Sequence, residues 1–149
     1  MNTLLETQLK CAKNAARLLK NMPTSTKNQA LDKIANALLE HSEDILEATK
    51  KDMAHAREVN MTSAMQDRLL FTHERIEGVS DGVKKVATLP DPIGEVMESW
   101  TRPNGLKISK VRVPIGVFGI IYEARPNVTV DIASLCLKSG NACVLRGGK

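Results

Sequence analysis

Apolar residues recur at helical spacing through the first part of the chain. The first set steps by three or four positions and comprises Leu5, Leu9, Ala12, Ala16 and Leu19. This spacing places all of them on one face of a helix. Because a proline disfavours helical geometry in the residue before it, Pro23 predicts that this helix ends near Met22.

Residues that can cap helices predict where the following helices begin. Thr26 and Gln29 have the spacing of a capping box. A helix that starts there would turn one apolar set inward, namely Ala30, Ile34, Ala37 and Leu38. Ser42 is expected to cap the next helix, with the acidic residues Glu43 and Asp44 at its positive end.

Two more helices are expected before residue 90. Ser63 and Gln66 repeat the capping box ahead of a short helix. Thr72 is expected to open a longer helix that runs to about Thr88. Together these patterns predict a layer of amphipathic helices with charged outer faces.

The sequence changes character after this helical part, where two prolines interrupt helical geometry. Asn104-Gly105 then predicts a β-hairpin with a type I′ turn, between strands at about 98–102 and 106–113. Apolar positions in the second strand change phase part-way along it, which predicts a bulge or a twist. Both subunit pairing and a solvated ribbon are consistent with such a hairpin.

The last part of the chain has the pattern of a βαβ unit. Residues 117–122 form a short apolar run, as expected for a strand buried on both faces. Residues 127–139 have helical spacing, and Gly140 follows at the usual C-terminal position. The inward set of that helix is expected to be Val128, Ile132, Leu135 and Cys136. Residues 141–145 form a second buried strand, parallel to the first through a right-handed crossover.

Composition and charge exclude several classes of protein. A net charge of +4 and 3% aromatic residues leave little for nucleic-acid binding, so we expect no nucleic-acid partner. No apolar run is long enough for a membrane span, so we expect no membrane partner. Three widely spaced cysteines argue against a disulfide framework and indicate a cytoplasmic protein. The three histidines lie far apart in the sequence, so no metal site is expected.

The parallel unit carries neither of two common phosphate-binding motifs. Gly116 and Gly119 do not belong to a G-x-G-x-x-G turn after a strand. A phosphate loop ending at Gly148-Lys149 would need a glycine where Cys143 stands. What remains is two polar strand ends, which is where parallel-sheet enzymes bind their ligands.

The second strand end reads Arg146-Gly147-Gly148-Lys149. Its glycines allow close approach of a ligand to the backbone, and Arg146 can pair with the 2′-phosphate that distinguishes NADP from NAD. A simple turn with a solvated arginine explains the same residues equally well.

The first strand end reads Glu123-Ala124-Arg125-Pro126-Asn127. Pro126 leaves Asn127 near the start of the helix, where backbone N–H groups lack partners. An asparagine amide in this place can donate a hydrogen bond to a developing oxyanion. From the residues alone, an asparagine that caps its own helix is the favoured interpretation.

These segments closely resemble gamma-glutamyl phosphate reductase, also called glutamate-5-semialdehyde dehydrogenase, of the aldehyde dehydrogenase superfamily. The most specific motifs are YEARPN and LRGGK, at 122–127 and 145–149. The resemblance also covers the DPIGE turn, the RPNGL hairpin and the helical N-terminal part.

The resemblance implies an α/β fold with a helical N-terminal layer, a β-hairpin and the start of a parallel Rossmann-like coenzyme-binding sheet. We expect residues 1–149 to be the N-terminal part of an NADP-binding domain, with the catalytic domain absent. Within it, 1–89 would form the helical layer, 90–113 the hairpin and 114–149 the βαβ unit.

The resemblance also implies a reaction, the NADPH-dependent reduction of L-glutamyl 5-phosphate to L-glutamate 5-semialdehyde and phosphate in proline biosynthesis. The substrate would acylate a cysteine thiolate, and NADP(H) would serve as the hydride cofactor. Asn127 matches the asparagine that stabilises the oxyanion, and Ile121 would lie along the nicotinamide. Arg146 matches the basic residue that contacts the adenosine ribose or its phosphate. The other cofactor-binding candidates follow it directly: Gly147, Gly148 and Lys149.

The cysteines in the chain do not have the surroundings of a nucleophile. Cys11 is expected on the inner side of the first helix, Cys136 on the crossover helix and Cys143 in a buried strand. None stands at a strand end beside a group that would lower its pKa. Since the family's catalytic cysteine comes later, we expect an incomplete part of the enzyme, inactive alone and homo-oligomeric in its full-length form. The alternative is a non-catalytic helical interaction or assembly module.

Overall fold

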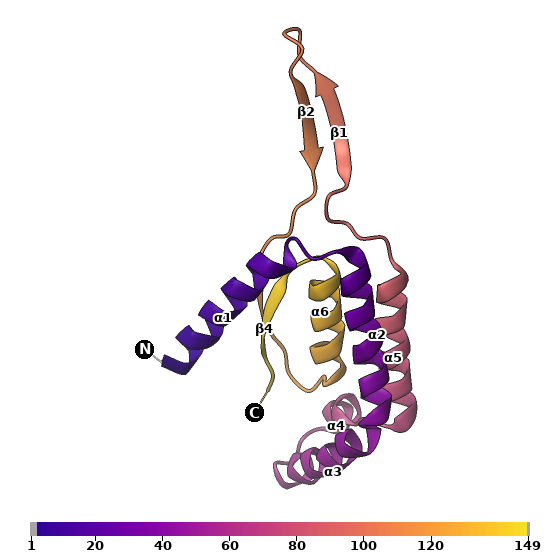
Figure 1. Cartoon of the computed structure of the whole chain (residues 1–149). Coiled ribbons are helices and arrows are strands. Elements are labelled where there is room, and N and C mark those ends of the chain that lie inside the picture. The colour runs from indigo at the N-terminus through magenta and orange to yellow at the C-terminus, as the bar shows by residue number, and fades with distance from the viewer. Residues whose placement is uncertain (1–2, 149) are drawn as a thin grey trace.

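The computed structural model describes residues 3–148, in which helices precede a hairpin and a parallel strand pair (Figure 1). The first five helices are α1 (Thr3–Leu19), α2 (Thr24–Glu40), α3 (Ser42–Glu58), α4 (Ser63–Leu69) and α5 (His73–Thr88). The remaining elements are β1 (Val96–Thr101), β2 (Lys107–Val111), β3 (Val117–Ile121), α6 (Asn127–Lys138) and β4 (Ala142–Arg146). The expected α/β fold is confirmed.

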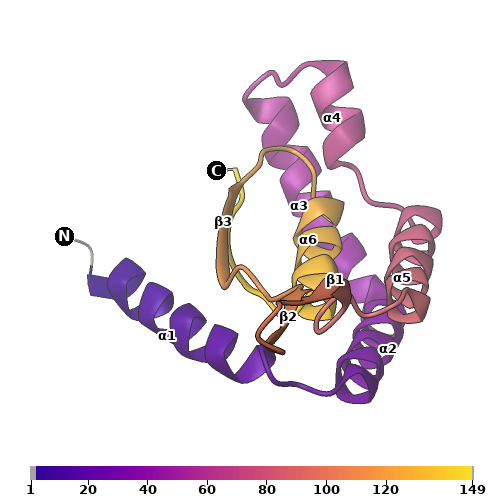
Figure 2. The same ribbon diagram turned by 90° about the horizontal axis from the view of Figure 1, so that it is seen from above.

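The predicted βαβ unit is present, with β3 and β4 parallel and α6 between them in the chain. The strands pair in register from Val117 opposite Ala142 to Ile121 opposite Arg146. Helix α1 lies on one side of the strand pair and α6 on the other (Figure 2). Small residues of α1 allow this close packing, because the buried Ala12 contacts the core around Ala142. The strand ends therefore stand between two helical layers.

Helices α2 and α5 lie side by side and form the second core (Figure 1). Leu31 and Ala35 of α2 pack against Val83 and Ala87 of α5, and all four are buried. Val130 and Leu137 extend this cluster onto α6. The helical layer therefore holds α6, and with it the start of α6, in a fixed place.

The inward face of α2 differs from the predicted one. The helix begins at Thr24 after Pro23, not at the capping box of Thr26 and Gln29. Its buried positions are Lys27, Leu31 and Ala35. Of the predicted inward set, only Leu38 packs against the core, whereas Ile34 and Ala37 are exposed. The prediction was wrong because a lysine occupies the centre of the buried face.

That lysine belongs to a buried polar cluster that joins three helices to the loop after α5. Lys27 forms an ion pair with Asp91 and donates to the carbonyl of Lys138, 3.2 Å away, at the end of α6. Lys138 in turn donates to the carbonyl of Ala87 at the end of α5, over 2.8 Å, and to Asn28, over 2.6 Å. Two cations thus satisfy the carbonyl ends of two helices, where the helix dipole favours positive charge.

Cap residues are displaced by one position in two other helices. His41 precedes α3 and Ser42 is its first residue, so Ser42 does not cap it. Thr62, not Ser63, caps α4 by accepting a hydrogen bond from the Met65 amide. Thr72 caps α5 as predicted and accepts from the Arg75 amide over 3.2 Å.

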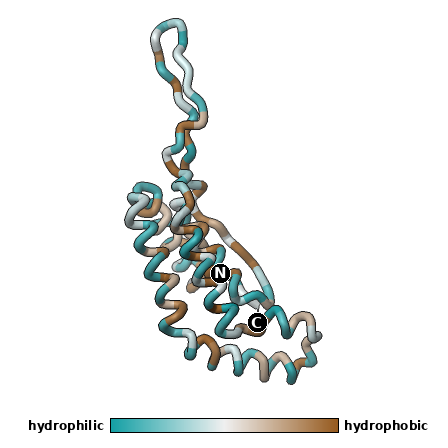
Figure 3. Tube along the Cα trace, turned by 90° about the vertical axis from the view of Figure 1, so that its right-hand side faces the viewer, coloured by the Kyte–Doolittle hydropathy of each residue, from teal (hydrophilic) through white to brown (hydrophobic). Residues whose placement is uncertain are grey.

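The predicted hairpin extends away from the helical body as a narrow ribbon (Figure 3). Its turn is not type I′, which needs positive φ at both central residues, because Gly105 has φ +84° and Asn104 has no positive φ. Instead Arg102 accepts from the Gly105 amide over 2.9 Å and donates to the carbonyl of Leu106, which closes a three-residue loop. A register shift is present, but its extra residue lies in β1, between Val96 and Glu98, and not in the second strand, where the apolar pattern predicted a bulge or twist.

Two expectations for α6 also need correction. The helix begins at Asn127 and ends at Lys138, so Ser139 is its C-cap. Leu135 was expected to pack on the sheet, but it is 49% exposed. Cys136 is buried as expected, and Gly140 adopts a positive φ of 67° after the helix.

Candidate functional site

The two polar strand ends identified from the sequence lie next to each other. Ile121 and Arg146 are register partners, and the Tyr122 amide donates to the Arg146 carbonyl over 3.0 Å. The chain then divides, with residues 122–126 leading into α6 and Gly147-Gly148 leaving β4. This edge of the strand pair brings the predicted residues together.

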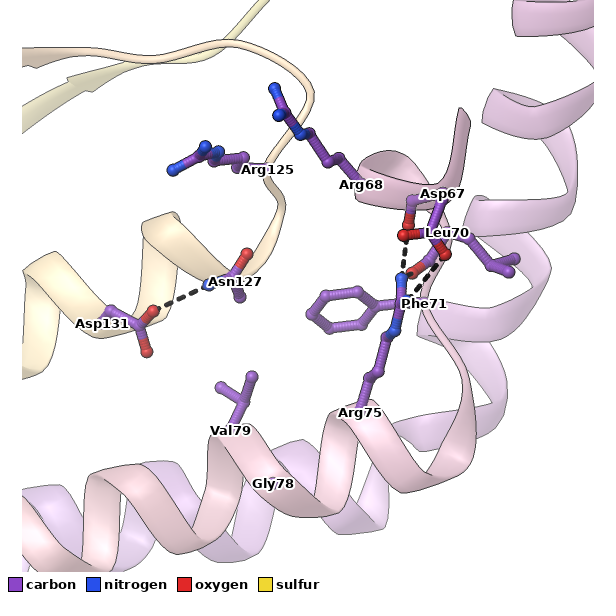
Figure 4. A pocket seen from close by; sticks show the side chains of 10 residues that line it. All are labelled: Asp67, Arg68, Leu70, Phe71, Arg75, Gly78, Val79, Arg125, Asn127 and Asp131. Atoms are coloured by element: carbon purple, nitrogen blue, oxygen red, sulfur yellow. Dashed lines mark hydrogen bonds and ion pairs between the residues drawn. The ribbon is translucent and has the colours of Figure 1, made fainter. Parts of the chain in front are cut away.

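Asn127 is the first residue of α6 and is partly buried. Pro126, not Asn127, is the N-cap residue of α6, so the interpretation favoured from the residues alone was wrong. Instead the amide nitrogen of Asn127 donates to a carboxylate oxygen of Asp131, one helical turn on, over 2.9 Å (Figure 4). A carboxylate only accepts, which fixes the orientation of the amide. The amide nitrogen carries two hydrogens, so one remains for another acceptor.

Asn127 and Asp131 line a cavity of about 540 Å³ (Figure 4). The opposite wall comes from the α4–α5 turn and α5, where the ring of the buried Phe71 and the side chain of Val79 face the space. This volume lies within the usual range for small-molecule sites. The cavity is therefore large enough for an amino-acid derivative beside the Asn127 amide.

A second cavity of about 480 Å³ lies beside the loop 122–126. Gly147 and Gly148 line it, together with the loop itself and residues of α3 and α4. Arg125 lines both cavities. The loop between β3 and α6 thus contributes to the lining of both cavities.

The two glycines after β4 leave the space beside them open. A Cβ atom at Gly147 would meet the Tyr122 ring at 3.9 Å, and one at Gly148 would meet the Glu123 backbone at 3.7 Å. Both are ordinary contact distances, and neither glycine has a positive φ. The packing of residues 3–148 therefore does not require glycine at either position, as expected of a cradle for a bound group.

The other predicted cofactor residues are less enclosed. Ile121 is 83% exposed, Arg146 is exposed, and neither lines the two cavities. Lys149 lies outside the described residues. The geometry thus brings Gly147 and Gly148 to a cavity and leaves Ile121 and Arg146 at the surface beside it.

The loop before Asn127 holds its backbone in an uncommon conformation. Ala124 has φ +46°, a left-handed geometry that residues with a Cβ rarely adopt. Such geometry persists where surrounding structure determines it, and it is frequent at ligand sites. Here it turns the chain from Tyr122 towards the start of α6.

None of the three cysteines lines either of the two cavities. Cys11 is exposed on α1, which corrects the expectation that it faces inward. Cys136 is buried, and burial together with the neighbouring Cys143 raises the pKa of its thiol to about 11. Cys143 is half-buried in β4. A protonated buried thiol is a poor nucleophile.

The histidines of residues 3–148 do not gather into a metal site. Each histidine lies at the surface beside one carboxylate, and no group of three or more His, Cys, Asp or Glu residues in this range is arranged to hold a metal ion. In the same range, no helix has both the length and the apolar character needed to cross a bilayer.

Sequence reasoning missed part of the Asn127 cavity. Asp131 was detectable, because residues four apart on a helix are neighbours. Arg68 and Phe71 were not detectable, since they are more than 50 positions from Asn127 and reach it only through the packing of α5 against α6.

Several known proteins that are similar to this chain are named gamma-glutamyl phosphate reductase. A gamma-glutamyl phosphate reductase from Clostridium novyi is 55% identical over 147 residues, which are 99% of this chain and 35% of that protein. One from Moorella thermoacetica is 55% identical over 150 residues, 99% of this chain and 36% of that protein. The chain spans about a third of the length of these curated relatives. No family model matches it.

Solved structures show the same similarity in three dimensions. The crystal structure of gamma-glutamyl phosphate reductase from Thermotoga maritima has a TM-score of 0.94 and 46% identity, covering 97% of this chain and 35% of that one. The enzyme from Saccharomyces cerevisiae has a TM-score of 0.90 and 38% identity, covering 94% and 36%. The similarity lies in the N-terminal portion of those structures.

Proposed function

By sequence and by fold, the chain corresponds to the N-terminal portion of gamma-glutamyl phosphate reductase, and from this premise we propose what its site contributes to the reaction. The proposed reaction is the NADPH-dependent reduction of L-glutamyl 5-phosphate to L-glutamate 5-semialdehyde and phosphate, a step of proline biosynthesis. The observation that carries this proposal is the Asn127 amide, oriented by Asp131 at a cavity of substrate size.

Asn127 stabilises the oxyanion in this proposal. A cysteine thiolate adds to the carbonyl carbon of the acyl phosphate, and negative charge develops on the carbonyl oxygen. The free N–H of the Asn127 amide donates a hydrogen bond to that oxygen. Asp131 holds the amide in the donating orientation throughout, so no reorganisation is needed when the charge develops.

The nucleophile is proposed to belong to another part of the full-length reductase. Cys11 is exposed on α1, Cys143 lies in a strand, and the Cys136 thiol has a raised pKa. We therefore expect the 149-residue chain alone to produce no NADPH from glutamate 5-semialdehyde, NADP and phosphate. Steady turnover by the purified chain would contradict this assignment.

Residues at the end of β4 are proposed to hold one edge of the coenzyme. Gly147 and Gly148 supply an open backbone surface, with Ile121, Arg146 and Lys149 as the neighbouring candidates. The adjacent cavity also contains acidic side chains, which suit ribose hydroxyl groups better than phosphate. When bound, NADPH supplies the hydride that reduces the thioester.

The wider setting of the chain is also proposed from its relatives. Residues 1–149 would form the N-terminal part of the NADP-binding domain, divided into the helical layer (1–89), the hairpin (90–113) and the βαβ unit (114–149). The full-length reductase would be a cytoplasmic homo-oligomer that acts on a small molecule. The exposed apolar residues of the hairpin, which include Val96, Met97 and Trp100, support pairing between subunits.

The assignment of Asn127 is tested in the full-length reductase. We expect Asn127→Ala to lower kcat roughly 100- to 1,000-fold, because removal of one oxyanion donor has that effect in other enzymes. The measurement is the initial rate of NADPH formation from glutamate 5-semialdehyde, NADP and phosphate.

Asn36→Ala is the matched control, since Asn36 is exposed on α2 and lines neither cavity. It should keep kcat within about twofold of the unmodified enzyme. If Asn127→Ala folds normally and also keeps its kcat, the oxyanion role is wrong.

A further inference from the structure

The Asn127 cavity has three arginines in its lining, and only one of them is engaged. Arg75 donates to the carbonyl of Leu70 over 2.7 Å and pairs with the Asp67 carboxylate over 2.8 Å. It also donates to the Asp67 carbonyl. These bonds close the turn between α4 and α5, so Arg75 has a structural role.

The other two arginines have no such partners. Within residues 3–148, the guanidinium groups of Arg68 and Arg125 form neither a hydrogen bond nor an ion pair. Figure 4 shows both of them at one side of the cavity, Arg68 extending from α4 and Arg125 from the loop before α6. Two separate elements thus bring unpaired cations to the same space.

The charge of the cavity is consequently unbalanced. Asp67 is neutralised by Arg75, and Asp131 accepts from an uncharged amide, so Asp131 is the one carboxylate in the lining without a cationic partner. Arg68 and Arg125 carry two positive charges against the one negative charge of Asp131, so the lining has one positive charge in excess. Guanidinium groups bind carboxylates and phosphates through paired hydrogen bonds, and they are weakly hydrated, so an anion displaces their water readily.

We propose that Arg68 and Arg125 bind an anionic oxygen group of the substrate, either its α-carboxylate or its phosphate, while Asn127 contacts the reacting carbonyl. The proposal rests on the proposed function. Arg125 is two residues before Asn127 in the chain, and both side chains line the same cavity. The carboxylate of Asp131 in this cavity also matches the ammonium group of an amino-acid substrate.

The reverse reaction separates the two possible anions, because glutamate 5-semialdehyde carries the α-carboxylate and inorganic phosphate is a second substrate. In the full-length reductase we expect Arg68→Met and Arg125→Met to raise one of the two KM values roughly ten- to hundred-fold, with a smaller change in kcat. A rise in the semialdehyde KM identifies the carboxylate, and a rise in the phosphate KM identifies the phosphate. Arg125→Lys should recover part of the loss, because it keeps the charge.

Lys33→Met is the control for loss of one positive charge, since Lys33 is exposed on α2 and lines neither cavity. If both arginine variants keep both KM values within about twofold of this control, the arginines are solvated surface charges and the proposal is wrong. If the proposed function itself is wrong, the unmodified enzyme shows no turnover of glutamate 5-semialdehyde. That result distinguishes a wrong function from a wrong role for the two arginines. Thermal unfolding of each variant confirms that the fold is intact.

Discussion

Single residues determine how closely the segments around the strand pair can approach. Gly140 follows α6 with φ +67°, and a Cβ atom there would stand 3.1 Å from the Pro114 side chain and 3.4 Å from the Leu19 carbonyl. The end of α1, the segment before β3 and the end of α6 therefore meet at this one residue. Gly147 is the opposite case, because a Cβ atom there would make only ordinary contacts and its φ is not positive.

This contrast gives a stability prediction with a built-in control. Gly140→Ala should lower the free energy of unfolding by about 1–2 kcal/mol for the left-handed backbone, with a further loss from the close contacts. Gly147→Ala should change it by less than about 0.5 kcal/mol. Urea unfolding of the 149-residue chain measures both, and equal losses in the two variants would contradict the account of Gly140.

The same contrast bears on function in the full-length reductase. If Gly147→Ala leaves the fold stable yet raises the KM for NADP, the added methyl group hinders close approach of the coenzyme to the backbone. An unchanged KM would remove Gly147 from the proposed coenzyme site.

The sequence predicted the type and order of the helices and strands more accurately than the residues at which they begin. The strand–helix–strand order of residues 117–146 followed from two apolar runs around one amphipathic stretch, and the structure confirms it. The N-cap positions shifted by one to three residues, because Pro23 precedes α2 in place of Thr26 and His41 precedes α3 in place of Ser42. At α4 two neighbouring residues could serve as the cap, and Thr62 does so rather than Ser63.

The buried face of α2 could not be predicted from the spacing of apolar residues. Periodicity counts apolar positions, so it could not identify Lys27 as the centre of the buried face. Lys27 is buried because the ends of α5 and α6 and the loop containing Asp91 surround it, and these lie far away in sequence. The lysine therefore acquires its role only in the assembled fold.

The ion pair between Lys27 and Asp91 makes the helical layer sensitive to acid. Burial alone would raise the pKa of Asp91, but hydrogen bonds from Lys27, Thr24 and the Ile93 amide, with the charge of Lys27, lower it. A carboxyl with a lowered pKa in the folded state stabilises that state above the unfolded pKa of about 3.9, and the stabilisation is lost as pH falls through that value towards the folded pKa.

Asp91→Asn should therefore destabilise the chain at pH 7 by on the order of 3 kcal/mol, since the buried Lys27 would lose the negative charge that pairs with it. The difference from the unmodified chain should shrink below about pH 4. Asp81→Asn is the control, because the Asp81–Lys84 pair is exposed and worth less than about 1 kcal/mol. Urea unfolding across this pH range gives the answer, and a pH-independent difference would contradict it.

At the scale of the whole molecule, the helical layers hold two strand ends in place and the hairpin extends away from them (Figures 1 and 3). The sequence predicted both strand ends through Asn127 and Gly147. It could not predict the cavity beside Asn127, because Phe71 and Arg68 reach it from elements distant in the chain. In the proposed function, the oxyanion donor lies in this part of the reductase and the nucleophile in another part.

The most direct test of that division removes every cysteine of this part of the full-length reductase. Replacing Cys11, Cys136 and Cys143 with alanine together, and comparing the rate of NADPH formation from glutamate 5-semialdehyde, NADP and phosphate, isolates their contribution. The account predicts that the cysteine-free segment supports a kcat within a few-fold of the unmodified enzyme, since none of the three thiols is expected to take part. A folded triple variant that no longer turns over, rescued by restoring one of the cysteines, would place the nucleophile in this chain and contradict the account.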